Sequence, residues 1–100
     1  MKLTGVDDYS ILYRLHASKR MFEREVYNDD VECVLKHGEI IEYYDDDYPL
    51  PSMLINGTTK NNRALHLVVA VNHDAKEIII VTVYEPNQFK WFDNFSRRIK

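Results

Sequence analysis

The chain has 100 residues, of which 45% are hydrophobic and 29% are charged, and its net charge is −3. This composition supports one modest core and argues against disorder, and no run approaches the roughly 20 apolar residues of a membrane helix. The first residues contain no stretch long enough for a secretory signal, and the lone Cys33 cannot form an internal disulfide. We therefore expect a single soluble domain in the cytoplasm.

The first third of the chain predicts two helices, over about residues 13–37. Residues 13–23 contain neither Gly nor Pro, and Leu15, Met21 and Phe22 lie among charged residues. The next segment, DDVECVLKHGE, has acidic residues in its first turn, basic residues in its last turn and Gly38 after it. This pattern is typical of a well-capped helix.

The sheet part is expected over about residues 39–85. The segments EIIEYY and SMLING read as two strands, and the stretches 65–71 and 78–84 read as the strongest strand pair. The fold class is therefore α+β, with two N-terminal helices packed on a twisted antiparallel sheet of about four strands. An aromatic C-terminal tail, residues 86–100, is expected to pack back on the domain as a turn and a short helix or strand.

Two registers fit the main hairpin, with His66 opposite either Thr82 or Val83. The first is preferred because it makes one face of the hairpin wholly apolar. The residues expected on that apolar face are Leu65, Leu67, Val69, Val71, Ile79, Val81 and Val83. The opposite face would then carry His66, Thr82 and Tyr84 at one end.

Basic residues follow one another at four-residue spacing on the first predicted helix. His16, Arg20 and Arg24 would lie along one edge of that helix. With His66, Thr82 and Tyr84, the chain then has imidazoles for proton transfer, guanidiniums for phosphate charge and hydroxyls for hydrogen bonds. Metal-independent RNA cleavage needs these groups, because the RNA's own 2′-hydroxyl is the nucleophile. Each residue taken alone also has an ordinary structural explanation.

Further residues are candidates for RNA binding rather than for catalysis. Lys19, Arg97 and Arg98 belong to short basic clusters that could meet phosphate, although such clusters are usually solvated surface. Trp91 could stack on a base, and closing the small core is its alternative role. The sequence carries no signal specific for DNA.

Metal and cofactor chemistry are not expected. Cys33 and His37 are four residues apart, but no second pair at ligand spacing follows. Cys33 is expected to be buried and inert, and the acidic run 45–47 to be a solvated turn. The chain also lacks a phosphate-binding glycine loop.

The chain resembles the family of small proteins catalogued as domain of unknown function 4258. The matching segments run in the family's order from about His16 to Arg98: HASKRMFERE, DVECVLKHGEIIEYY, YPLPSMLING, LHLVV, VTVYEP and WFDNFSRR. This resemblance implies kinship with RelE-like and barnase-like ribonucleases, in which N-terminal helices pack on an antiparallel sheet. It also implies a toxin that cleaves RNA, either free or ribosome-bound, with a small zinc-ribbon antitoxin as partner.

The resulting hypothesis is a toxin-like endoribonuclease. It assigns proton transfer to His66 and His16, phosphate stabilisation to Arg20 and Arg24, and substrate positioning to Thr82 and Tyr84. The sheet shows no obvious carboxylate for the general base of barnase-like enzymes. The alternative is a non-catalytic protein-binding module of the same fold.

Overall fold

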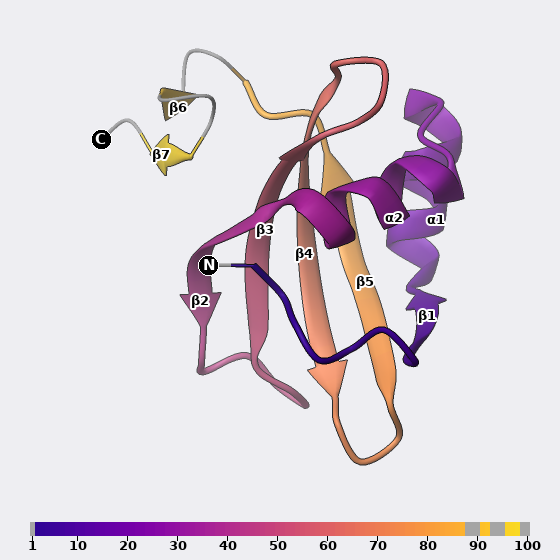
Figure 1. Cartoon of the computed structure of the whole chain (residues 1–100), viewed down its shortest axis with the longest axis vertical. Helices are drawn as coiled ribbons and strands as arrows, with labels where there is room; N and C mark the ends of the chain where they lie inside the picture. Colours follow the sequence, from indigo (N-terminus) through magenta and orange to yellow (C-terminus); the bar gives the residue numbers. More distant parts are fainter. Residues whose placement is uncertain (1, 88–90, 93–95, 99–100) are drawn as a thin grey trace.

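The computed structural model describes residues 2–87, 91–92 and 96–98, with the backbone alone described at residues 91, 92, 97 and 98. Its elements are β1 (Ser10–Tyr13), α1 (Leu15–Arg24), α2 (Asn28–His37), β2 (Glu39–Tyr44), β3 (Ser52–Thr58), β4 (Ala64–Asn72), β5 (Glu77–Tyr84), β6 (Trp91–Phe92) and β7 (Arg97–Arg98) (Figure 1). This is the α+β class that the sequence predicts. Within the described residues, no helix is both long and apolar enough to cross a membrane.

The main sheet has five strands, in the order β1-β5-β4-β3-β2. β1 runs parallel to β5, whereas all other neighbours are antiparallel. The prediction of about four antiparallel strands was therefore wrong in two respects: the sheet has a fifth strand, and that strand runs parallel to its neighbour. The additional strand is only four residues long, which is too short for a periodic pattern to be recognised. In the tail, β6 and β7 form a separate two-stranded pair.

The hairpin of β4 and β5 contains a β-bulge that neither predicted register includes. β5 has one extra residue, Val81, which lies between the paired positions. Beyond the bulge, His66 lies opposite Tyr84 rather than opposite Thr82 or Val83. The preferred register, with His66 opposite Thr82, was wrong along the whole hairpin, whereas the alternative register holds between the turn and the bulge, from the pair Val69–Ile80 to the pair Asn72–Glu77. The bulge then shifts every later pair by one more position, so that His66 faces Tyr84 instead of Val83.

The observed register also changes which residues of β5 face the core. Ile78 and Ile80 are buried in the core, whereas Ile79 and Val81 are only half-buried. Both Ile79 and Val81 were predicted on the apolar face, and this prediction was wrong. Val83, beyond the bulge, faces the core as predicted.

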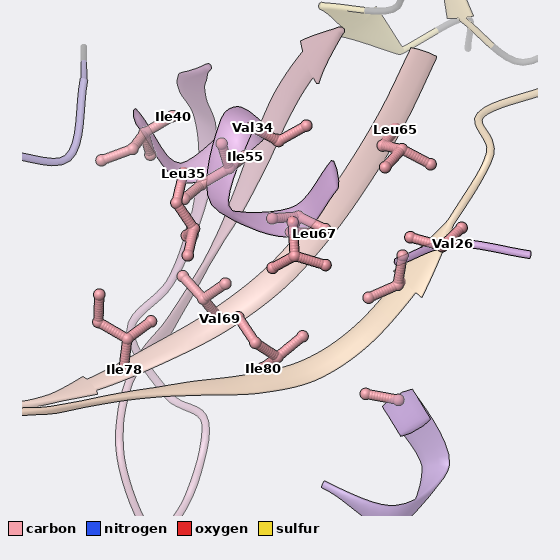
Figure 2. Close-up of a cluster of buried hydrophobic side chains, with 13 residues drawn as sticks. Val26, Val34, Leu35, Ile40, Ile55, Leu65, Leu67, Val69, Ile78 and Ile80 are labelled. Atoms are coloured by element: carbon pink, nitrogen blue, oxygen red, sulfur yellow. The ribbon is translucent and has the colours of Figure 1, made fainter. Parts of the chain in front are cut away.

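The core lies between one face of the sheet and the two helices (Figure 2). α2 buries Val31, Val34 and Leu35, whereas Ala17 is the one fully buried residue of α1. The buried cluster consists of Ala17, Val26, Val31, Val34, Leu35, Ile40, Ile55, Leu65, Leu67, Val69, Ile78, Ile80 and Val83. α2 is therefore the main cover of the sheet, and α1 packs alongside β5.

Gly38 ends α2 where the chain turns into β2. A Cβ atom at this position would lie 2.8 Å from Ile55 Cγ2 and 2.9 Å from the backbone oxygen of Asn56. These two neighbours belong to β3, and the nearest atom of all is the backbone oxygen of Val34 in α2, so the helix end and the strand together leave no room for a side chain. This contact fixes how closely α2 approaches the sheet.

We expect Gly38→Ala to lower the free energy of unfolding by about 2 to 3 kcal/mol, because the new methyl group meets the Val34 backbone oxygen of α2 and overpacks the contact between α2 and β3. Urea unfolding followed by circular dichroism measures this change. Gly5→Ala is the matched control: a Cβ there meets nothing within 4 Å, and its φ of +74° costs about 1 kcal/mol. Equal losses in both variants would contradict the crowding at Gly38.

The N-terminal segment crosses β4 and β5 on the same side as α2 (Figure 1). Two contacts tie it to the turn between β4 and β5. Lys76 Nζ donates to Asp8 Oδ2 at 3.1 Å, and the Tyr9 hydroxyl lies 2.8 Å from His73 Nδ1. The hydrogen bond and the charge of Lys76 lower the pKa of Asp8 below its ordinary value.

We expect Lys76→Ala to raise the pKa of Asp8 toward its ordinary value. A lowered carboxyl pKa stabilises the folded state above the unfolded-state pKa, and this contribution is lost as the pH falls through the folded-state pKa. Wild type should therefore be slightly more stable than the variant at neutral pH. At about pH 2, where the Asp8 carboxyl is protonated, the two proteins should be equally stable. NMR titration of the Asp8 carboxyl and urea unfolding at both pH values test this; a gap that widens in acid contradicts it.

Candidate functional site

The face of the sheet opposite the core carries a row of polar side chains. His66 lies between Leu65 and Leu67 on β4, and both leucines belong to the core, so His66 points to the other face. Cross-strand partners share a face, and the pairing places Asn56 on one side of His66 and Tyr84 on the other. We call this side of the sheet the His66 face.

His66 and Tyr84 form the closest polar contact on this face. His66 Nδ1 lies 3.0 Å from the Tyr84 hydroxyl, and the rings meet edge to face with centroids 5.2 Å apart. Which of the two donates depends on the tautomer of the imidazole. His66 is 0% exposed, whereas Tyr84 is half-buried. Both residues make further interactions besides this one.

Thr82 lies on the His66 face, next to the pair. It is half-buried, lies two residues before Tyr84 and pairs with Val68. The bulge at Val81 gives Thr82 and Tyr84 this orientation, because a regular strand would turn both residues toward the core. The structure thus brings together His66, Thr82 and Tyr84, three of the residues that the sequence analysis selected.

Two carboxylates extend the site across β2, and the sequence analysis missed both. Glu39 pairs with Asn56, which completes a polar row of Glu39, Asn56, His66 and Tyr84 over four strands. Glu42 lies on the same face, where its Oε1 accepts a 2.6 Å hydrogen bond from the Tyr44 hydroxyl.

A second bulge explains why these carboxylates were not recognised. Glu39 and Glu42 are three residues apart, so a regular strand would place them on opposite faces. The pairing skips Ile41, and this brings both side chains to the same face. A bulge of this kind has no sequence signal that single-sequence reasoning can use.

The basic residues of α1 lie apart from the polar row. α1 is helical from Leu15 to Arg24, so His16, Arg20 and Arg24 lie along one edge of it. His16, Lys19 and Arg24 are exposed, and Arg20 is half-buried. Among residues 2–87, no hydrogen bond or ion pair joins these side chains to His66, Thr82 or Tyr84. Their connection to the site is the packing of α1 alongside β5.

Arg63, which the sequence analysis did not select, links α1 to the ends of β4 and β5. Its guanidinium donates to the backbone oxygens of Arg24 and Glu25 at 2.7 and 2.8 Å, which satisfies carbonyls at the end of α1. Its Nε lies 3.3 Å from Glu85 Oε2, one residue after Tyr84. Arg63 therefore fixes the end of α1 next to the strand that carries Tyr84.

The predicted RNA-binding residues of the tail are described only in part. Trp91 lies in β6 and pairs with Arg98 of β7, while Arg97 pairs with Phe92. The side chains of these residues lie outside the described part of the structure. The predicted stacking and phosphate contacts therefore stay predictions.

A cleft of about 550 Å³ lies between the N-terminal segment and α2, away from the His66 face. Its lining includes Leu3, Val6, Cys33, Lys36 and His37. Cys33 is half-buried rather than buried as predicted, and its thiol contacts the backbone oxygen of Thr58 at 3.6 Å. Within the described residues, no group of three or more His, Cys, Asp or Glu side chains is placed to hold a metal ion.

Comparison with known families gives one match. The family described as "Domain of unknown function (DUF4258)" matches residues 13–85, which include α1, α2 and β2 to β5. No curated protein and no solved structure matches the chain.

We expect Tyr84→Phe to lower the free energy of unfolding by about 1 kcal/mol, because it removes a hydroxyl that bonds a buried imidazole. Tyr48→Phe is the matched control, since Tyr48 is 93% exposed and its hydroxyl is already solvated. Thermal and urea unfolding of both variants measure the difference. A Tyr84→Phe protein as stable as the control would show that the hydrogen bond makes no net contribution.

Proposed function

This chain belongs to the domain of unknown function 4258 family, and we propose that it is a metal-independent endoribonuclease of the toxin type. The observation that carries the proposal is the hydrogen-bonded pair of His66 and Tyr84 within a polar row on the His66 face. The order of two helices before antiparallel strands supports kinship with the RelE-like and barnase-like fold. The unpaired Cys33 is consistent with a reducing cytoplasm.

The reaction requires two proton transfers and stabilisation of one phosphate. The 2′-hydroxyl of the RNA loses its proton and attacks the adjacent phosphorus, the bond to the 5′-oxygen breaks, and that oxygen takes up a proton. The products are a 2′,3′-cyclic phosphate and a 5′-hydroxyl end. Neither a protein nucleophile nor an external reactant is needed, so side chains that move protons and donate hydrogen bonds are sufficient.

The burial of the two rings divides their roles. Tyr84 is half-buried, so its hydroxyl is the group of the pair that reaches the RNA. His66 is fully buried beside it on the neighbouring strand, and exchanges a proton with that hydroxyl over the 3.0 Å contact. Glu39 and Glu42, on the same face, are the candidates for a general base. Thr82 donates a hydrogen bond to the substrate.

Phosphate stabilisation comes from α1 in this proposal. Arg20 and Arg24 lie along one edge of the helix beside β5, the strand that carries Tyr84, and His16 begins the same edge as the second proton carrier. A guanidinium suits a phosphoryl group because it is always charged and can donate two parallel hydrogen bonds. Arg63 holds the end of this helix in place.

The second candidate function is a non-catalytic module that binds a protein partner, such as a small zinc-ribbon antitoxin. The full burial of His66 favours this alternative, because a buried imidazole has no direct access to a substrate. Under this alternative the polar row stabilises the sheet, and the partner binds elsewhere on the surface.

We expect wild type to generate new internal RNA ends in a cell-free translation reaction, each with a 2′,3′-cyclic phosphate. Cleavage should fall by about 100-fold or more in Tyr84→Phe and in His66→Gln, because proton transfer contributes 10² to 10⁴ in rate. Arg24→Ala should lower it as well. Mapping of RNA ends in the same reactions gives all four results.

Tyr48→Phe is the control variant, and circular dichroism confirms that each variant is folded. Cleavage at wild-type rate by a folded His66→Gln would remove the imidazole from the mechanism. Intact RNA with every protein, including wild type, would favour the binding module.

A further inference from the structure

α1 presents two large apolar side chains to solvent. Leu15 is 86% exposed and Phe22 is 88% exposed, although the sequence analysis took both as part of a helix that packs on the core. They are seven residues apart, so they lie two turns, or about 10.5 Å, from each other along one stripe. The opposite side of the helix carries Ala17 and Met21, which pack on the core. Two large apolar side chains exposed on the same side of one helix are a candidate contact surface when a partner of matching charge can cover both.

A lysine divides this stripe. Lys19 is exposed, and it lies between Leu15 and Phe22 within an arc of about 60° around the helix. We call these three residues the α1 stripe. Along the helix, the stripe is therefore apolar at Leu15, cationic at Lys19 and apolar again at Phe22.

The surroundings of the α1 stripe are basic on an otherwise acidic protein. Residues 14–24 contain four cationic side chains and one carboxylate, a net charge of +3, against −3 for the whole chain. The other residues together therefore carry −6. A partner drawn to this helix by its charge is an acidic one.

From these observations we propose that the α1 stripe binds an acidic amphipathic helix of a partner protein. The fitting segment has two apolar residues seven apart and a carboxylate between them, so that its apolar residues cover Leu15 and Phe22 while its carboxylate pairs with Lys19. The partner's remaining acidic residues complement the net charge of α1. The apolar part of this surface, Leu15 and Phe22, has no role in the proposed RNA cleavage, whereas its charged surroundings include Lys19, Arg20 and Arg24.

Two other occupants fit the stripe less well. RNA would pair with the basic residues but would leave Leu15 and Phe22 without an apolar partner. A second copy of the chain would match Leu15 with Phe22 in an antiparallel pair of α1 helices, and this arrangement brings the two Lys19 ammonium groups together near the two-fold axis. The acidic helix satisfies all three residues of the stripe.

The test uses a fluorescein-labelled helical peptide of about four turns, with two leucines seven residues apart, glutamates between them and at its flanks, and alanine and glutamine elsewhere. A matched peptide carries lysine in place of every glutamate. Fluorescence anisotropy measures binding of both peptides to the full-length protein. We expect the glutamate peptide to bind and the lysine peptide to bind at least about tenfold more weakly.

The variants separate the apolar and the charged parts of the stripe. Leu15→Ser combined with Phe22→Ser should weaken binding of the glutamate peptide by about tenfold or more. Lys19→Glu should weaken it by about two- to fivefold and improve binding of the lysine peptide. Tyr48→Ser, which removes another exposed aromatic ring, should leave both affinities unchanged. Since all these side chains are exposed, circular dichroism melting curves should not change.

Several results would overturn the proposal. These are no binding of the glutamate peptide, equal binding by the Leu15→Ser/Phe22→Ser protein, or no preference between the two peptides. Sedimentation velocity of the protein alone would assign the stripe to a second copy if it found a dimer that the double variant loses. Weaker binding of a single-stranded RNA by the double variant, with peptide binding intact, would assign it to RNA. Because the peptide assay contains no RNA, a failure of the proposed nuclease activity leaves its result unaffected.

Discussion

Side chains alternate between the two faces of a strand, and in this sheet two bulges reset the alternation. The extra residue Val81 in β5 turns Ile80 toward the core and Tyr84 toward the opposite face. The extra residue Ile41 in β2 places Glu42 on the same face as Glu39. The core and the polar row therefore depend on the same constraint, the positions of the two bulges, because a side chain that points to one face of the sheet cannot point to the other.

The regular elements of this fold could be predicted because their signals are local. Gly38 and the acidic first turn mark the ends of α2, and the β-branched run of β5 marks a strand. β1 could not be predicted, since four residues carry no periodic signal and its strand pairing is with a distant segment. Leu15 and Phe22 are residue types that are usually buried. A predicted helix alone therefore does not indicate that both side chains are exposed.

The candidate site was predictable where it depended on one strand and not where it depended on several. His66 stood out as a polar residue within an apolar strand, and alternation alone puts Thr82 and Tyr84 on one face of β5. The preferred register placed that face with His66, because its error at His66 is two residues, which does not change the face. Asn56 became its neighbour only through the pairing of β3 with β4. Arg63 is one basic residue of a polar connection in the sequence, and only the tertiary structure places its guanidinium at the carbonyls of α1.

The position of β1 at the edge of the sheet has a consequence for synthesis on the ribosome. Ser10 to Tyr13 pair with Glu77 to Ile80, so the first strand made must wait for the last strand of the main sheet. Until then, Ile11 and Tyr13 have no partner strand, and the nascent chain exposes apolar residues that later pack on the core. Such a non-local pairing forms late, because the entropy cost of closing the long intervening loop must be met before the contacts between the strands can stabilise it. β1 thus closes the sheet after β5 has left the ribosome.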